Sequence, residues 1–200
     1  MPEPRIDYVF GYGSLVARRA ALMVEGARFP AVPARLGGFR RLWGVAMNNW
    51  EAAPSKKHYV DRADGRAPRV RIAFLDIEEK AGAGVNGLAI PVDAAHLAAL
   101  DVREVNYERI DVSTAVEPRL PHRVFTYRGT DAARARRREG ESGAEICVSS
   151  DYLAAVRRAF ADLGADALAE FELTTAVLPF PQRDLELIQP APGSEDISVS

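Results

Sequence analysis

The sequence is poor in the features that would indicate a redox, nucleic-acid or membrane role. Its 200 residues contain a single cysteine, Cys147, so no internal disulfide can form. The 26 Lys and Arg residues are balanced by 28 Asp and Glu residues, which gives a formal net charge of −2. This balance excludes the strong basic field that draws a protein to nucleic acid or to anionic membranes.

Long hydrophobic runs are also missing. No window approaches the roughly 18 apolar residues of a transmembrane helix, because charged residues interrupt every run. The first residues, MPEPRIDYVF, lack the basic leader and the apolar stretch of a secretory signal. We therefore expect a soluble, cytoplasmic protein with no nucleic-acid partner and no membrane partner.

The composition that remains is that of a globular protein. Hydrophobic residues make up 48% of the chain and charged residues 27%, which argues against disorder. A chain of this length can bury roughly 70% of its unfolded surface around one core. The last twenty residues are dense in proline and serine, which favours an unstructured tail. The expected organisation is one domain over residues 1–180 and a tail over residues 181–200.

Short β-branched, aromatic and alternating apolar runs predict a series of strands. Gly44 is expected to form a bulge in the second strand, and Gly82 and Gly84 a turn between the third and the fourth. The last two strands, on either side of a proline-containing connection, are expected to pair with each other. The predicted strands cover residues 6–10, 38–50, 70–74, 85–90, 110–116 and 123–128.

Helices are expected in the middle and near the end of the chain. Asp93 caps the first, Ser149 or Ser150 caps the second, and Gly164 ends the second. This succession predicts an α+β fold with a mixed or mainly antiparallel sheet, which can curl into a barrel, and not a Rossmann order. The expected helices cover residues 94–103, 150–163 and 166–173; the expected surface connections are residues 51–68 and the arginine-rich solvated loop 131–143.

The first candidate site is the segment Phe10-Gly11-Tyr12-Gly13-Ser14-Leu15, directly after the first strand. Its two glycines leave backbone N–H groups unscreened, and such a loop can hold an anion; the alternative is a plain tight turn. The segment does not match the dinucleotide-binding fingerprint, because Val16 stands where a third small residue is required. Tyr12 and Val16 likewise exclude the G-x-S-x-G nucleophile elbow around Ser14.

The second candidate site is the segment LDVREVNYER over residues 100–109, where a helix ends and a strand begins. Alternating charges at such a junction are typical of a solvated surface. The residues by themselves do not favour Glu104 over Glu108 as a functional carboxylate.

Taken together, the two segments resemble the γ-glutamylcyclotransferase superfamily. Its members carry a motif of the form FGYGSL after the first strand and a motif L-D-x-R-E-x-x-Y-x-R roughly ninety residues later. The form FGYGSL is most similar to the ChaC-like branch. The intervening segments ARLGGFRR (34–41) and VNGLA (85–89) are similar in order to the family's strands, so the resemblance spans about residues 5–128.

This resemblance implies a small mixed, mainly antiparallel β-barrel flanked by helices. It implies an enzyme that cyclises the γ-glutamyl group of glutathione or a related compound to 5-oxoproline and releases the amine or peptide, with no cofactor and no metal. Glu104 would be the catalytic carboxylate. Only Val105 and Asn106 separate Glu104 from the next tyrosine, a shorter spacing than is usual in the family, so the substrate stays open. The implied substrate-binding residues are Gly11, Tyr12, Gly13, Ser14, Leu15, Tyr107 and Tyr127. For Tyr127 the alternative is a tyrosine of the core or of the barrel wall.

The chemistry of this reaction sets requirements on the site. The α-amine of the substrate attacks its own γ-carbonyl, so the enzyme must hold the chain curled and remove the ammonium proton. We expect Glu104 to be partly desolvated at the floor of a cavity beside the Gly11–Leu15 turn, with Arg103 and Arg109 pointing away from it.

Other readings remain open at this stage. The first is a non-catalytic module that binds a γ-glutamyl-like ligand on the same fold. The second is a hydrolase that uses Cys147 with His122 or His58, although no nucleophile motif surrounds Cys147. The three histidines have no spacing that resembles a metal-ligand set.

Overall fold

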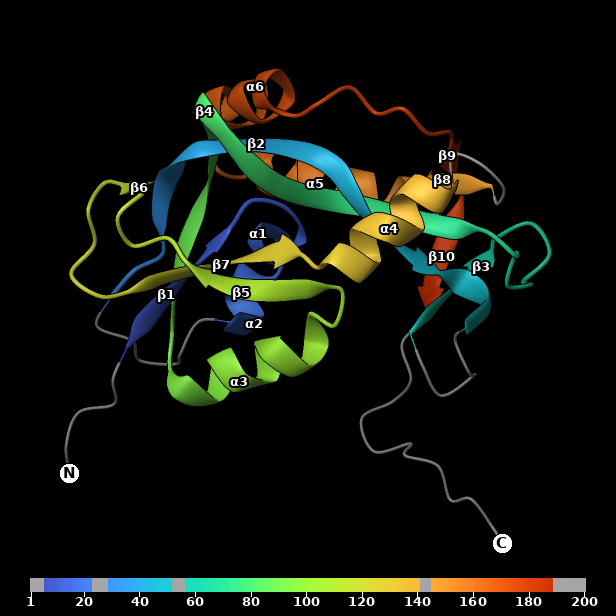
Figure 1. The fold of residues 1–200 in the computed structure, drawn as a ribbon, viewed down its shortest axis with the longest axis horizontal. Coiled ribbons are helices and arrows are strands. Elements are labelled where there is room, and N and C mark those ends of the chain that lie inside the picture. Colours follow the sequence, from blue (N-terminus) through green and yellow to red (C-terminus); the bar gives the residue numbers. More distant parts are fainter. Residues whose placement is uncertain (1–5, 23–28, 52–56, 141–144, 189–200) are drawn as a thin grey trace, which may run out of the picture.

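The computed structural model describes residues 6–22, 29–51, 57–140 and 145–188, and Figure 1 shows its arrangement. One curved sheet forms the centre, and helices lie at its faces and ends. The elements are β1 (Asp7–Gly11), α1 (Ser14–Ala17), α2 (Arg19–Leu22), β2 (Val32–Asn48), a 3-10 turn (Asn49–Glu51), β3 (His58–Asp61), β4 (Arg71–Val92), α3 (Ala94–Arg103), β5 (Tyr107–Asp111), β6 (Val116–Glu117), β7 (Val124–Gly129), α4 (Asp131–Gly140), β8 (Ile146–Ser149), α5 (Ser150–Ala161), α6 (Ala165–Thr174), β9 (Gln182–Arg183) and β10 (Leu185–Ile188).

The main sheet is mixed and mainly antiparallel. Its strand order is β5-β7-β1-β4-β2-β6, with β8 added to β4 and β9 added to β8. The pair β1–β7 is parallel, as are β4–β8 and β8–β9, whereas the other pairs are antiparallel. The expected α+β class is therefore confirmed, but the described strands form an open path from β5 to β6 and do not close into a barrel.

Two long strands, β2 and β4, form the most extensive strand pair of this sheet. They pair over most of their length, and the register shifts between Leu42 and Val45, which confirms the expected bulge at Gly44. A Cβ atom at Gly44 would overlap the side chain of Asp76, so this close approach requires glycine. The two strands expected over 70–74 and 85–90 are wrong as separate elements, because the chain runs through Gly82 in a single strand with a second irregularity and no reversal.

The pairing expected between the strands near 110 and 125 is confirmed for β5 and β7. The first of these strands begins earlier than expected, at Tyr107, and ends at Asp111. The chain then turns, and Val116–Glu117 pairs with β2 instead.

The predicted helix caps are confirmed. The Asp93 carboxylate accepts a hydrogen bond from the N–H of His96 at 2.8 Å at the start of α3. The Ser149 hydroxyl does the same for α5, and residues 165–174 form α6 as expected. Figure 1 shows α3 beside β5 and α6 beyond the β2–β4 arm. None of the helices within the described ranges is both long and apolar enough to cross a membrane.

Three expectations about irregular segments are wrong. Residues 131–140 of the expected solvated loop form α4, which packs against β2. Residues 58–61 of the expected surface connection form β3, and β3 pairs with β10 in a second, two-stranded sheet. Residues 182–188 of the expected tail form β9 and β10, because Leu185 is fully buried in a small second core; residues 189–200 lie outside the described residues.

A buried arginine of β2, Arg41, links β2 and β4 to α6. Arg41 is fully buried, and its guanidinium lies 4.6 Å from the ring centroid of Phe171 and 5.2 Å from that of Phe160. It donates hydrogen bonds to Asn86, Thr175 and the Phe171 carbonyl. This set of contacts fixes α6 on β2 and β4, at the side of the sheet away from α3.

Candidate active site

One cavity brings together the loop after β1 and the end of α3, the two segments that carry the sequence motifs. Its volume is about 1180 Å³. Four of its walls come from the loop after β1, the end of α3, the first residues of β4 and the first turns of α5. The lining residues that matter below are Tyr12, Gly13, Ser14, Leu15, Arg18, Lys57, Tyr59, Phe74, Leu75, Arg103, Glu104, Asn106, Tyr107, Tyr127, Arg136, Asp151 and Tyr152.

Glu104 reaches this cavity because α3 ends there. Its N–H donates to the carbonyl of Leu100 at 2.8 Å, and its carbonyl accepts from the N–H of Tyr107 at 2.8 Å. This turn directs the side chain into the cavity, where 13% of its surface is exposed. Glu108, by contrast, forms an exposed ion pair with Arg128 at 2.7 Å and does not line the cavity. The fold therefore separates two carboxylates that the sequence left equivalent.

The surroundings of Glu104 differ in part from the expectation. Arg109 does point away, since it pairs with Asp101 at 2.7 Å. Arg103 does not: its Nη1 atom lies 3.3 Å from Oε1 of Glu104. The carboxylate is thus partly desolvated but has a guanidinium beside it. The same Nη1 atom is buried without a hydrogen-bond partner among the described residues, so the contact is an ion pair with unused donor capacity.

The glycines of the first motif have different roles in the structure. Gly11 belongs to β1 and does not line the cavity; a Cβ atom there would lie 3.0 Å from Cβ of Leu15, so a side chain would crowd the turn. Gly13 does line the cavity. A Cβ atom there would make ordinary contacts with Leu75 and would lie 3.7 Å from the hydroxyl of Tyr152, in the cavity wall. A side chain at position 13 would therefore take space from the cavity.

The predicted tyrosines all line the cavity, and their hydroxyl hydrogens are already used. Tyr12 donates to the carbonyl of Tyr127, Tyr107 to the carbonyl of Leu75, and Tyr127 to Asp101, each at 2.8 Å. Burial raises the pKa of Tyr12 and of Tyr107 well above the ordinary tyrosine value. These neutral hydroxyls can therefore accept a hydrogen bond from a ligand but have no hydrogen left to donate.

Tyr152 has the opposite arrangement, and the sequence analysis missed it. Its hydroxyl oxygen accepts from the N–H of Leu75 at 3.3 Å, and no acceptor for its hydrogen is found among the described residues. Burial raises its pKa, so the hydroxyl stays protonated and can donate to a ligand beside Gly13. The one available signal was the predicted helix cap at Ser149, which places Tyr152 in the first turn of α5.

The arginine-rich segment 131–143 also contributes to this region, against the expectation of a solvated loop. On α4, Arg136 lines the cavity and donates to Asn106 at 2.6 Å and to the carbonyl of Ala46 at 2.9 Å. Arg134 pairs with the buried Asp76. The inward face of this helix is therefore built from arginines, which a search for apolar periodicity does not detect.

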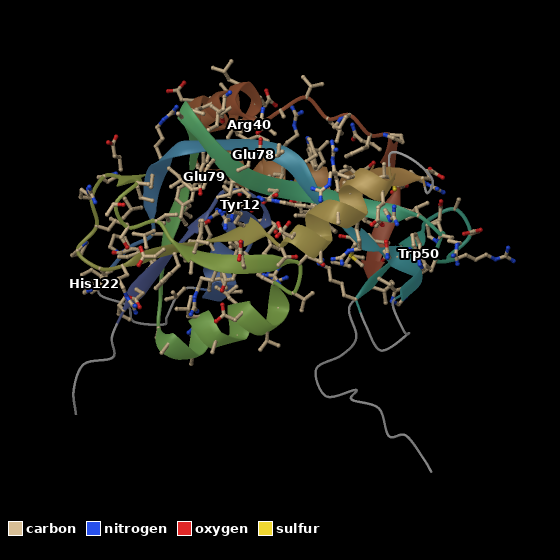
Figure 2. The ribbon with its side chains drawn as sticks, viewed as in Figure 1. Tyr12, Arg40, Trp50, Glu78, Glu79 and His122 are labelled. Atoms are coloured by element: carbon tan, nitrogen blue, oxygen red, sulfur yellow. The ribbon has the colours of Figure 1, made fainter. Side chains whose placement is uncertain are left out.

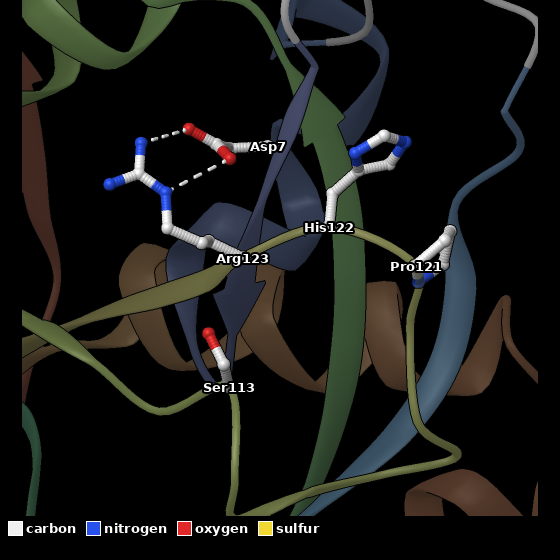
Figure 3. A pocket seen from close by; sticks show the side chains of 5 residues that line it. All are labelled: Asp7, Ser113, Pro121, His122 and Arg123. Atoms are coloured by element: carbon white, nitrogen blue, oxygen red, sulfur yellow. Dashed lines mark hydrogen bonds and ion pairs between the residues drawn. The ribbon is translucent and has the colours of Figure 1, made fainter.

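The alternative catalytic groups are not assembled. Cys147 is fully buried in β8 and lines neither of the two best-defined cavities. His122 lines a smaller cavity of about 330 Å³ beside the Asp7–Arg123 ion pair, and Figure 3 shows its ring turned away from Arg123. His58 lies in β3, outside both cavities. No group of three or more His, Cys, Asp or Glu side chains suited to a metal ion occurs among the described residues.

Comparison with known proteins gives the fold. No protein-family model and no curated protein matches the sequence. Among solved structures, the chain is similar to one described as gamma-glutamyl cyclotransferase, with 17% identity, a TM-score of 0.52, and coverage of 88% of this chain and 92% of that chain. An uncharacterized protein from Homo sapiens matches with 16% identity, a TM-score of 0.50, and coverage of 84% and 88%.

YkqA from Bacillus subtilis matches with 18% identity and a TM-score of 0.54; the match covers 88% of this chain and 56% of YkqA, so the chain spans little more than half of that protein. The chain therefore has the fold of a solved gamma-glutamyl cyclotransferase structure. At the level of fold, the resemblance noted from the two sequence motifs is confirmed.

Proposed function

We propose that this protein is a γ-glutamylcyclotransferase that converts the γ-glutamyl group of glutathione or a related compound into 5-oxoproline and releases the amine or peptide. The observation that carries this proposal is the presence of Glu104 and the Tyr12–Leu15 loop in one cavity, although about ninety residues separate them in the chain. The fold is also that of a solved structure described as gamma-glutamyl cyclotransferase.

The reaction needs no cofactor, because the substrate carries its own nucleophile. The α-amine attacks the γ-carbonyl carbon, the new C–N bond closes a five-membered ring, and the bond to the leaving nitrogen breaks. Holding the γ-glutamyl chain curled in the cavity supplies orientation that is worth up to roughly 7–11 kcal/mol in favourable intramolecular reactions. Two protons leave the α-ammonium nitrogen as it becomes the ring amide, and two reach the departing nitrogen, which leaves as an ammonium; a group in the site must carry the first proton that moves.

Glu104 is the group proposed to carry that proton. As a carboxylate it takes the proton from the α-ammonium, and as a carboxylic acid it returns the proton to the leaving nitrogen. The ion pair with Arg103 must yield during this cycle, because the incoming ammonium competes with the guanidinium for the same carboxylate. The oxygens of Tyr12 and Tyr107 can accept hydrogen bonds from the substrate's ammonium group.

The loop is proposed to hold an anionic part of the substrate. Gly13, Ser14 and Leu15 line the cavity, and their backbone N–H groups would suit either the α-carboxylate or the oxygen that becomes negative as the amine attacks. The Tyr152 hydroxyl adds a donor at the same place. Tyr127 is proposed as an aromatic wall, since its hydroxyl is committed to Asp101.

The test compares two matched variants. Glu104→Gln keeps the size of the side chain and removes the base, so we expect 5-oxoproline formation to fall at least about a hundredfold with an unchanged thermal midpoint. Glu108→Gln makes the same change outside the cavity and should keep full activity. Unchanged turnover by Glu104→Gln would rule out this mechanism, and a comparable loss in Glu108→Gln alone would transfer the role.

The same measurement decides between an enzyme and a binding module. If the wild-type protein binds γ-glutamyl compounds but releases no 5-oxoproline from any of them, the cavity is a ligand-binding site without catalysis.

A further inference from the structure

The cavity holds more positive charge than its carboxylates neutralise. Three cationic residues line it near one carboxylate, Glu104: Arg18 directly after α1, Lys57 before β3 and Arg103 at the end of α3. Arg103 is within 3.3 Å of that carboxylate. Within the part of the chain that the structure describes, no carboxylate lies at ion-pair distance from Arg18 or from Lys57.

The other charged residues of the lining do not change this balance. Asp151 lies on the wall formed by α5 and is paired with Arg62. Arg136 also contributes positive charge, but its guanidinium is held in place by hydrogen bonds to Asn106 and to a backbone carbonyl.

The positive charges of Arg18, Lys57 and Arg103 destabilise one another's charged forms. Burial lowers the pKa of Arg18, and the charge of Arg103 lowers it further. Burial also lowers the pKa of Lys57, again with a contribution from Arg103. Although much of the Lys57 side chain is exposed, its ammonium lies 5.5 Å from the ring centroid of Phe74, at the cavity wall. A concave site with excess charge of one sign is complementary to a ligand of the opposite sign.

The γ-glutamyl group itself does not provide the missing charge. Its α-carboxylate and its α-ammonium cancel, so a bound γ-glutamyl group leaves the excess positive charge in place. Only an anionic leaving group would neutralise it.

We propose that Arg18 and Lys57 form a receptor for a carboxylate on the leaving group, so that the enzyme acts on γ-glutamyl amino acids or peptides and discriminates against neutral γ-glutamylamines. This inference rests on the proposed function for its catalytic readout but makes a separate prediction for binding. One charge-assisted contact of this kind corresponds to a preference of about tenfold or more.

The experiment uses two substrates that differ only in the charge of the leaving group, γ-glutamylglycine and γ-glutamylglycinamide. For the wild-type protein we expect a kcat/KM at least about tenfold higher for the acid, chiefly through a lower KM. Arg18→Gln and Lys57→Gln should each reduce that preference, because kcat/KM falls for the acid by a larger factor than for the amide.

Arg40→Gln is the control, because Arg40 pairs with Glu78 and neither residue lines the cavity; both are labelled in Figure 2. It removes the same charge and should leave both substrates unaffected.

The outcomes separate the two proposals. Equal kcat/KM for the acid and the amide would overturn the leaving-group receptor and leave the cyclotransferase intact. If neither substrate yields 5-oxoproline, the cyclotransferase fails, and calorimetric binding decides the receptor. Tighter binding of the acid that is lost in Arg18→Gln would then support it, and equal or absent binding would overturn it.

Discussion

The ion pair between Arg134 and Asp76 offers a direct test of how the fold supports the cavity. Asp76 lies on β4 and is 1% exposed, and its Oδ2 atom accepts from Nε of Arg134 at 2.8 Å. Its Oδ1 atom accepts from the N–H of Gly129 at 2.7 Å and from that of Ile77 at 2.8 Å. One carboxylate thus joins β4, the end of β7 and α4, and it directly follows Leu75 of the cavity wall.

Removing the arginine leaves a buried carboxylate without its cation. Breaking such a pair from one side costs about 3–5 kcal/mol. The lower end applies here, because Arg134 is 23% exposed, so water can enter, and two backbone N–H groups remain on Asp76. For Arg134→Met we therefore expect the free energy of unfolding to fall by about 3 kcal/mol. In a chain of this length that corresponds to a decrease in Tm of roughly 6–12 °C.

The measurement is equilibrium unfolding in urea together with a thermal melt. Arg138→Met is the matched control, because Arg138 lies on the same helix with its side chain exposed. It should change the unfolding free energy by no more than about 0.5 kcal/mol. If the two variants differ by less than about 1 kcal/mol, the pair does not hold α4 on the sheet and the reasoning is refuted.

Two further predictions concern the cavity and the core. Tyr152→Phe removes the donor beside Gly13, so we expect kcat/KM for 5-oxoproline formation to fall about tenfold. The unfolding free energy should also fall by about 1 kcal/mol, because the Leu75 N–H loses its acceptor. Unchanged kinetics would exclude a contact between Tyr152 and the ligand. Burial raises the pKa of Cys147 from 9.0 to about 11, so the folded protein keeps the neutral thiol while the unfolded chain ionises. The contribution of Cys147 to the unfolding free energy should therefore be fully present below pH 9 and should decrease up to about pH 11. A disulfide reagent at pH 8 should label the thiol only in denaturant. Rapid labelling of the native protein would contradict this.

Local patterns were sufficient for most of the elements. The caps at Asp93 and Ser149 were predictable because a short polar side chain satisfies N–H groups within three residues of itself. The bulge at Gly44 was predictable from a glycine in an aromatic strand. The fold class followed from the order of these elements, and the two motifs indicated the family that shares it.

Other elements were not predictable, because their partners lie far away in the chain. The helix α4 has no apolar stripe, and its inward face becomes buried only because Asp76 and backbone carbonyls accept its arginines. The segment that forms β10 has the composition of a proline-rich tail, and it forms a strand because it pairs with β3. In both cases the stabilising contact is absent from any local window of sequence.

The candidate site was likewise only partly predictable from the sequence. The sequence alone determined which residue types were available and which two segments carry the chemistry. Only the tertiary structure decided that Glu104 and not Glu108 faces the cavity, that Arg103 contacts it, and that Tyr152 points to the loop. The physical reason is that burial, charge pairing and hydrogen-bond capacity depend on which side chains meet in space, and only the folded chain brings β4, α3 and α5 together.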